Sequence, residues 1–159
     1  DDVLVIFGDI LFDSQILQQI LASNDDIAMA IDLNWEKSYN EGLCNSHPLD
    51  EPVLINQKKV LRISYKQTDT MIENQTVGEF LGVIKLSANG SRTIIKKYEE
   101  LEKSHVGRFH DANSLEKAKL ADILQELIDS KIEISFIAVN GKWCEIDTPK
   151  DLERARKNF

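Results

Sequence analysis

Residues 3–9 read VLVIFGD, five consecutive apolar residues followed by a glycine and an aspartate. An apolar run without alternation predicts a β-strand that is buried on both faces. Because this strand would end near Asp9, it places that carboxylate at the rim of a sheet, where open α/β folds bind their ligands. A strand of this kind normally has neighbours on both sides, so we expect the chain to be part of a larger protein.

A second acidic segment lies near the other end of the chain, where residues 143–147 read WCEID. Side chains alternate between the faces of a strand, so Trp143, Glu145 and Asp147 are expected to point the same way. Carboxylates at two strand ends can share one Mg²⁺ ion and the phosphates that it carries. Purely structural roles for these residues stay open. Asp147 can stabilise the N-terminus of the helix that Thr148 caps, and Trp143 can be a core residue.

The chain between these segments alternates between strand and helix patterns. Apolar or alternating runs predict strands at residues 3–8, 27–31, 59–66, 79–86 and 134–139, and amphipathic spacing predicts helices from residue 13 or 14, at 89–104, at 120–128 and at 149–158. That order is typical of α/β layers. Predicted hairpins near residue 60 and at Asn140-Gly141 add antiparallel strands. We therefore expect a Rossmann-like three-layer sandwich with a mixed, mostly parallel sheet that is N-terminally incomplete.

Two stretches between the predicted elements carry weaker signals. Residues 33–57 are polar and contain Pro48 and Pro52, which predicts a long loop or lid with a short helix near Trp35. Trp35 is therefore a candidate for a residue that covers a substrate pocket. Residues 113–116, Asn-Ser-Leu-Glu, predict a capping box for the helix that follows.

Length and composition narrow the possible classes of protein. The 159 residues suffice for one domain with a real core, and no apolar run approaches the roughly 20 residues of a membrane span. The net charge of −8 argues against nucleic acid and anionic membranes as partners. Cys44 and Cys144 lie far apart without metal-type spacing, which favours reduced thiols in a cytoplasmic protein.

Three segments resemble, in this order, the later part of the nucleotidyltransferase family. They are VLVIFGDILF at residues 3–12, EFLGVIKLS at residues 79–87 and VNGKWCEIDTPKDLERA at residues 139–155. The sequence is most similar to the cytidylyltransferase-like domain that is fused behind phosphoenolpyruvate phosphomutase in phosphonate biosynthesis. The resemblance covers residues 1–159 and implies a single nucleotidyltransferase-like domain, the C-terminal portion of a longer polypeptide.

The resemblance also implies roles for individual residues. Asp9 and Asp147 match the acids that bind Mg²⁺ and take part in catalysis, while Glu145 and Glu79 match residues that contact the acceptor. The implied reaction joins an NTP, with CTP expected, to a small phosphate or phosphonate such as phosphocholine or 2-aminoethylphosphonate. An acceptor oxygen attacks the α-phosphorus, and pyrophosphate is released. Trp143, beside the two acids, would suit a cationic acceptor group.

One part of the family pattern is missing from this sequence. The family has a glycine-rich loop with arginine and lysine upstream of the strand that matches residues 3–9, and none of the seven glycines here lies in such a run. We therefore expect an upstream segment of the same polypeptide as a partner, and no activity from this chain alone.

Other functions are alternatives to nucleotidyl transfer. A non-catalytic binding or regulatory domain would lack the same loop, and a sugar-phosphate nucleotidyltransferase would share the remaining motifs. A phosphatase with an aspartyl nucleophile needs two aspartates one position apart, which the spacing of Asp9 and Asp13 does not provide. A metal site formed by His105 and His110 lacks the three- or four-residue spacing of a helical site.

Overall fold

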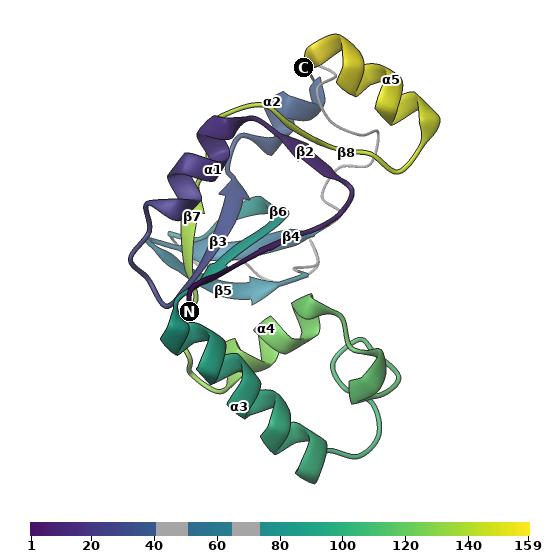
Figure 1. Cartoon of the computed structure of the whole chain (residues 1–159). Helices are drawn as coiled ribbons and strands as arrows, with labels where there is room; N and C mark the ends of the chain where they lie inside the picture. Colours follow the sequence, from purple (N-terminus) through teal and green to yellow (C-terminus); the bar gives the residue numbers. More distant parts are fainter. Residues whose placement is uncertain (41–50, 65–73) are drawn as a thin grey trace.

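The computed structural model describes residues 1–40, 51–64 and 74–159 (Figure 1). The strands are β1 (Val3–Ile6), β2 (Ile10–Phe12), β3 (Ile27–Asp32), β4 (Pro52–Asn56), β5 (Lys59–Ile63), β6 (Thr76–Leu86), β7 (Ser135–Ala138) and β8 (Trp143–Glu145). The helices are α1 (Ser14–Leu21), α2 (Trp35–Asn40), α3 (Ala88–Ser104), α4 (Leu120–Asp129) and α5 (Pro149–Asn158), with a 3-10 turn, η1, at Leu115–Lys117. In the described part of the chain, no helix is long and apolar enough to cross a membrane.

Six strands form one mixed sheet in the order β1-β6-β3-β7-β5-β4, and β6 also pairs with β4. The α/β fold and the mixed sheet agree with the sequence prediction. The expectation of a mostly parallel sheet is wrong for the described strands, because only the pair β3–β7 is parallel. The strand β6 lies between β1 and β3 and runs antiparallel to both. A largely apolar run such as residues 80–84 indicates burial on both faces but carries no information about strand direction.

The strand directions bring several strand ends to one edge of the sheet. Both β1 and β3 are antiparallel to β6, and β7 is parallel to β3, so these three strands run the same way. Their carboxyl ends therefore lie at the same edge. Glu79, near the start of β6, is paired with Asp32 at the end of β3.

Helices cover both faces of the sheet. Met29 and Ile31 of β3 belong to a core cluster that includes Leu124 of α4. Ala28 and Ala30, which alternate with them, belong to a second cluster that includes residues of α1. Figure 1 shows α1 on one side of the sheet, and α3 and α4 on the other. The buried pattern of β3 on both faces follows from this double cover.

The predicted hairpin at Asn140-Gly141 is wrong. After β7 the chain does not fold back; β8 pairs instead with β2, in a separate two-stranded ribbon. The Asp13 carboxylate accepts hydrogen bonds from the backbone N–H of Lys142 at 3.0 Å and of Gln15, in the first turn of α1, at 3.1 Å. Gly141 has φ 149°, and a Cβ there would lie 2.7 Å from Asp13 Oδ1. The chain therefore passes closely over the start of α1 and is directed to β2.

The segment predicted as a long loop contains a strand. Pro52–Asn56 is β4, which forms an antiparallel hairpin with β5, and α2 begins at Trp35 as predicted. The remaining part of the predicted lid, residues 41–50, lies outside the described residues. The first strand, β1, pairs only with β6 among the described strands, and its residues Val3 and Ile6 are each 43% exposed.

Candidate functional site

Three carboxylates meet where the ribbon β2–β8 adjoins the main sheet; we call them the acidic trio. Asp9 lies in the turn after β1, Glu145 is the last residue of β8, and Asp147 precedes the cap of α5. The ribbon pairs Ile10 with Glu145, and the N–H of Ile146 donates to the Asp9 carbonyl at 2.8 Å. One oxygen of each carboxylate lies within 4.8 Å of the others. The structure therefore brings Asp9 and Asp147 together and adds Glu145, which the sequence assigned to the acceptor.

The acidic trio has the donor chemistry of a hard divalent cation. Carboxylate oxygens are the ligands that Mg²⁺ prefers, together with water and substrate phosphates. Asp9 and Asp147 are exposed and Glu145 is half-buried, so a bound ion would remain open to a phosphate from solvent. Three negative charges this close repel one another, and a cation between them would relieve that repulsion. The residues present fit Mg²⁺ or Mn²⁺.

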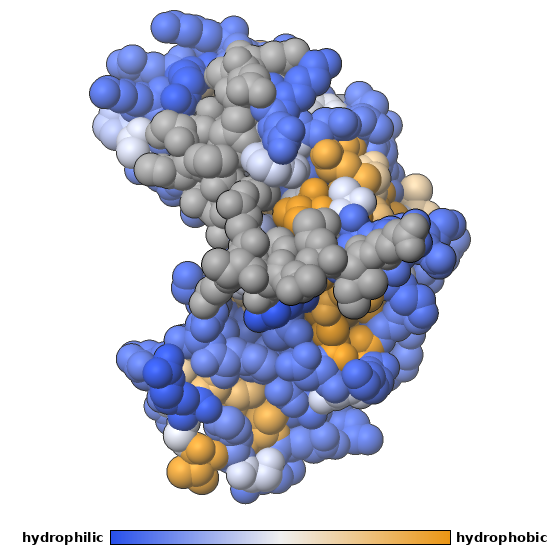
Figure 2. Space-filling model, turned by 180° about the vertical axis from the view of Figure 1, so that it is seen from behind, coloured by the Kyte–Doolittle hydropathy of each residue, from blue (hydrophilic) through white to orange (hydrophobic). Residues whose placement is uncertain are grey.

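A cavity of about 490 Å³ begins beside the acidic trio. It lies between the ribbon, the start of α4 and the middle of β6. The residues that line it are Phe7, Asp9, Ile10, Glu51, Glu79, Phe80, Leu81, Gly82, Lys119, Leu120, Ala121, Trp143 and Glu145. Seen from behind, the molecule is indented between the part that carries α5 and the part formed by α3 and α4 (Figure 2).

A glycine in β6 shapes one wall of the cavity. Gly82 has φ 70°, and a Cβ there would lie 2.5 Å from the ring of Phe7. Only glycine allows this approach without displacing the aromatic ring. Phe7 then makes an edge contact with Phe80, with the ring centroids 5.8 Å apart. These residues form the apolar part of the wall.

Two buried carboxylates lie at the sheet edge behind the acidic trio. Asp32 is 5% exposed and Glu79 is 3% exposed, and they face each other across β3 and β6. The Nε1–H of Trp143 donates to Asp32 Oδ2 at 2.9 Å, and the N–H of Glu51 donates to Glu79 Oε1 at 3.2 Å. Trp143 is therefore both a buried anchor and a wall of the cavity. Since Glu79 also lines the cavity, this side of it is acidic.

The lining of the cavity also includes a positive charge. Among the described residues that line the cavity, Lys119 is the one with a cationic side chain. It precedes α4, and its backbone N–H donates to the Asp122 carboxylate at 2.8 Å, which satisfies the start of that helix. A helix N-terminus favours anionic groups nearby.

The capping box predicted at residues 113–116 is wrong, because those residues lead into η1 and α4 starts later.

The remaining predicted and missed residues can be placed as well. Trp35 begins α2 and is not among the described residues that line the cavity. Sequence reasoning missed Asp32 and Lys119. A signal for Asp32 was present, because it closes the apolar strand IAMAID just as Asp9 follows VLVIFG. Lys119 had no such signal, since the cap of this helix was predicted at residues 113–116 rather than at Lys119.

In sequence and in fold, the chain is similar to one class of enzyme. No family model matches the chain. Over 152 residues, 96% of this chain and 58% of the relative, it is 22% identical to the CTP:phosphoglutamine cytidylyltransferase of Campylobacter jejuni. A candidate glucose-1-phosphate thymidylyltransferase from Bacillus anthracis, solved in complex with sucrose, is 14% identical, with a TM-score of 0.56 over 99% of this chain and 54% of that one.

The chain resembles nucleotidyltransferases in sequence and in fold. One comparison rests on sequence and the other on the arrangement of the backbone. In both cases the chain spans little more than half the length of the protein that it matches.

Proposed function

We propose that this chain is part of an enzyme that transfers a cytidylyl group from CTP to a small phosphate or phosphonate. The observation that carries the proposal is the acidic trio, which lies beside a cavity whose lining includes both further acids and Lys119. Its similarity to a cytidylyltransferase supports CTP as the nucleotide. The catalytic residues of the proposal are Asp9 and Asp147.

In this proposal the side chains of the chain bind and orient the two substrates. Asp9, Asp147 and Glu145 would hold Mg²⁺, which when bound neutralises charge on the nucleotide phosphates. The cavity holds the acceptor with its anionic group toward Lys119. An acceptor oxygen then forms a bond to the α-phosphorus, and the bond from that phosphorus to the β-phosphate oxygen breaks. Pyrophosphate leaves, and positioning rather than a covalent enzyme intermediate accelerates the step.

The acidic side of the cavity favours an acceptor with a cationic group. Glu79 and Trp143 both line the cavity, and a carboxylate together with an aromatic ring suits an ammonium group. Phosphocholine and 2-aminoethylphosphonate each carry a cation at one end and a phosphorus oxyanion at the other. We therefore propose such a zwitterionic acceptor, of the kind used in phosphonate biosynthesis.

We also propose that an upstream segment of the same polypeptide completes the catalytic centre. The relatives are nearly twice as long as the region matched here. The apolar strand β1 has an edge that no described strand pairs with. A further strand there would extend the sheet into the Rossmann-like three-layer sandwich that the sequence predicts and would bring the nucleotide-binding loop. A preceding phosphoenolpyruvate phosphomutase domain belongs to the same proposal.

Pyrophosphate release by the full-length polypeptide tests this function. The assay supplies CTP and Mg²⁺ with phosphocholine, 2-aminoethylphosphonate or glucose 1-phosphate in parallel. Asp9→Asn and Asp147→Asn are expected to lower kcat by roughly 100-fold or more, because charge stabilisation at the phosphates is lost. Glu153→Gln, on the exposed face of α5, is the matched control.

The outcomes separate the alternatives. Turnover with glucose 1-phosphate alone would move the assignment to a sugar-phosphate nucleotidyltransferase. Binding of CDP-choline by calorimetry without any turnover would favour a non-catalytic binding or regulatory domain. Turnover that survives Asp9→Asn would remove the acidic trio from the mechanism.

A further inference from the structure

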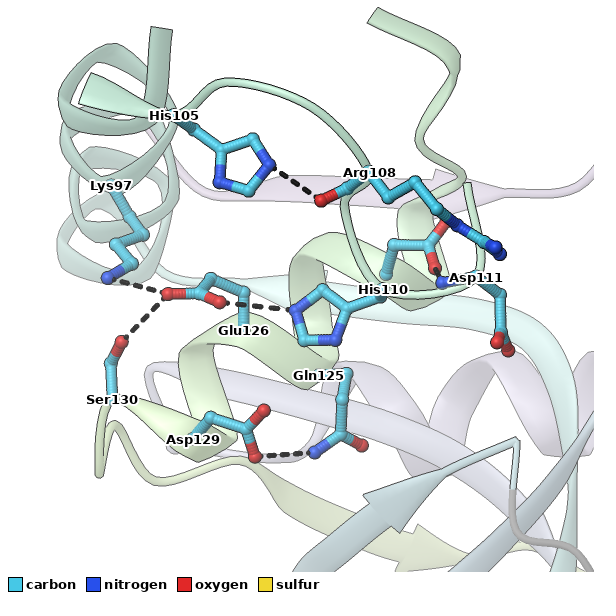
Figure 3. Close-up of polar contacts among 10 residues, drawn as sticks. Lys97, His105, Arg108, His110, Asp111, Gln125, Glu126, Asp129 and Ser130 are labelled. Atoms are coloured by element: carbon cyan, nitrogen blue, oxygen red, sulfur yellow. Dashed lines mark hydrogen bonds and ion pairs between the residues drawn. The ribbon is translucent and has the colours of Figure 1, made fainter. Parts of the chain in front are cut away.

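A second group of potential metal ligands shares no residue with the acidic trio and lies where the turn after α3 meets α4 (Figure 3). His110 comes from the turn, and Glu126 and Asp129 lie one helical turn apart on α4. One ligand atom from each of the three lies within 4.8 Å of the other two. His110 Nε2 and Glu126 Oε2 are 3.1 Å apart.

This separation suits ligands of one tetrahedral ion. Ligand atoms about 2.0–2.1 Å from a zinc ion lie roughly 3.3 Å from each other. The observed 3.1 Å between His110 and Glu126 is close to that value, so an ion could replace their hydrogen bond with little movement. Asp129 Oδ1 accepts a hydrogen bond from Gln125 Nε2 at 2.8 Å, and a carboxylate has a second oxygen that can serve as a ligand.

The charged side chains around His110, Glu126 and Asp129 are compatible with a bound cation. Lys97 Nζ lies 2.9 Å from Glu126 Oε1, while Oε2 faces His110. A histidine that ligates a metal ion is neutral, so in the metal-binding form two carboxylates and one ammonium give this group a net charge of −1. The side chains of His110 and Glu126 are 22% and 21% exposed, so their contact is partly withdrawn from water, while Asp129 is exposed. Charges are screened less in such a place than on the open surface.

The backbone holds His110 in position. His110 has φ 48°, a left-handed conformation that is uncommon for a residue with a side chain. Its neighbour Asp111 donates its N–H to Asp122 Oδ1 at 3.3 Å, which ties the turn to the first turn of α4.

We propose that His110, Glu126 and Asp129 bind a zinc-type divalent ion at a site separate from the acidic trio. One imidazole nitrogen with two carboxylates is a donor set for Zn²⁺, Co²⁺ or Ni²⁺, whereas the all-oxygen acidic trio suits Mg²⁺. The ion joins the turn to α4, the helix that begins beside Lys119 and the cavity. It therefore acts as a structural clamp on one wall of the cavity.

Calorimetric titration with Zn²⁺, on the untagged 159-residue chain in excess Mg²⁺, tests the proposal. The excess Mg²⁺ occupies the acidic trio, and the same titration on Asp9→Asn excludes it further. Visible absorption with Co²⁺ reports nitrogen and oxygen coordination directly. The variants are His110→Asn, because asparagine tolerates a left-handed backbone, and Asp129→Asn, which keeps the side-chain shape. His105→Gln, in the same turn but outside the group, is the matched control.

We expect one Zn²⁺ per chain, with affinity reduced at least about 10-fold in His110→Asn and Asp129→Asn and unchanged in His105→Gln and Asp9→Asn. The thermal midpoint of unfolding should rise with Zn²⁺ in the parent chain but not in His110→Asn. Binding that is absent, or that is equally strong in His110→Asn, would overturn the proposal. None of these readouts depends on nucleotidyl transfer, so either proposal can fail without the other.

Discussion

The contacts of single side chains explain why sequence analysis found some residues of this site and missed others. Trp143 was a candidate for substrate contact or for the core, and the structure buries it, with a hydrogen bond to Asp32, in the lining of the cavity. Its contact with a substrate remains a prediction. That bond joins residues 111 positions apart and has no signature in the sequence. Cys144, next to Trp143, is buried, and burial raises the pKa of its thiol. It is therefore a packed thiol rather than a reactive one.

Lys119 offers a test at the scale of one residue. If it holds the anionic group of the acceptor, Lys119→Met in the full-length polypeptide should raise the KM for the acceptor roughly 10- to 100-fold, as expected for loss of a charged hydrogen bond worth about 1.5–3 kcal/mol. The KM for CTP should change little. Steady-state kinetics with each substrate varied in turn measures both. Lys117→Met, in η1 and away from the cavity, is the control, and equal effects of the two variants would contradict the assignment.

Each structural element depends on contacts that its own sequence does not reveal. The helix α3 begins where Ser87 accepts hydrogen bonds from the N–H groups of Asn89 and Gly90. Gly90 weakens a helix by propensity, yet a Cβ there would lie 2.0 Å from the Asp26 carbonyl oxygen. Packing of α3 against the start of β3 therefore requires glycine at a position where helix propensity disfavours it.

The contact between Asp26 and the start of α3 makes stability depend on pH. The hydrogen bond from Ser87 first, and then that from Asn89, hold the pKa of the Asp26 carboxyl below its ordinary value. A lowered pKa in the folded state stabilises the fold above the unfolded-state pKa, near 4, and this contribution is lost as the pH falls further. The difference in unfolding free energy between the parent and Asp26→Asn should thus be largest at neutral pH and shrink below about pH 4. Urea unfolding at several pH values measures it, and a pH-independent difference would contradict it.

Gly141 decides the path between two strands. Gly141→Ala should destabilise the chain by about 1–3 kcal/mol, because φ 149° strains a residue with a Cβ and the new methyl group would press against Asp13. Gly8→Ala is the matched control, since a Cβ at Gly8 meets nothing within 4 Å. Urea unfolding of both variants gives the comparison. Equal stability of Gly141→Ala and the parent would show that the turn adapts without cost.

At the scale of the whole molecule, the acidic trio joins distant parts of the chain. Asp9 follows the first strand, and Asp147 immediately precedes the last helix. The ribbon β2–β8 that positions them stands apart from the main sheet in Figure 1. A cation held there would link the two ends of the chain and stabilise only the folded state.

Metal binding should therefore raise the stability of the entire chain. With Mn²⁺ at about 100 times its dissociation constant, the folded state gains roughly 2.7 kcal/mol, seen as a higher thermal midpoint of unfolding. Asp9→Asn and Asp147→Asn should lose most of this gain, while Asp129→Asn should keep it. Scanning calorimetry with and without Mn²⁺ makes the comparison. A gain that all three variants share would place the ion elsewhere.

The sequence by itself determined the features that depend on residues close together along the chain. Apolar runs and their spacing located β1, β3, β6 and β7 and the helices α1, α3 and α5, because burial and helical periodicity are local patterns. The acids that follow apolar strands, Asp9 and Asp147, were singled out for the same reason. Their roles in catalysis remain predictions.

Only the tertiary structure decided how these elements and acids combine. The direction of β6, the pairing of β8 with β2 rather than β7, and the buried pair Asp32 and Glu79 all depend on contacts between distant residues. The addition of Glu145 to the acidic trio and the position of Lys119 follow from those pairings. Strand pairing is set by backbone hydrogen bonds and by packing on both faces of the sheet. A short stretch of sequence determines neither of them.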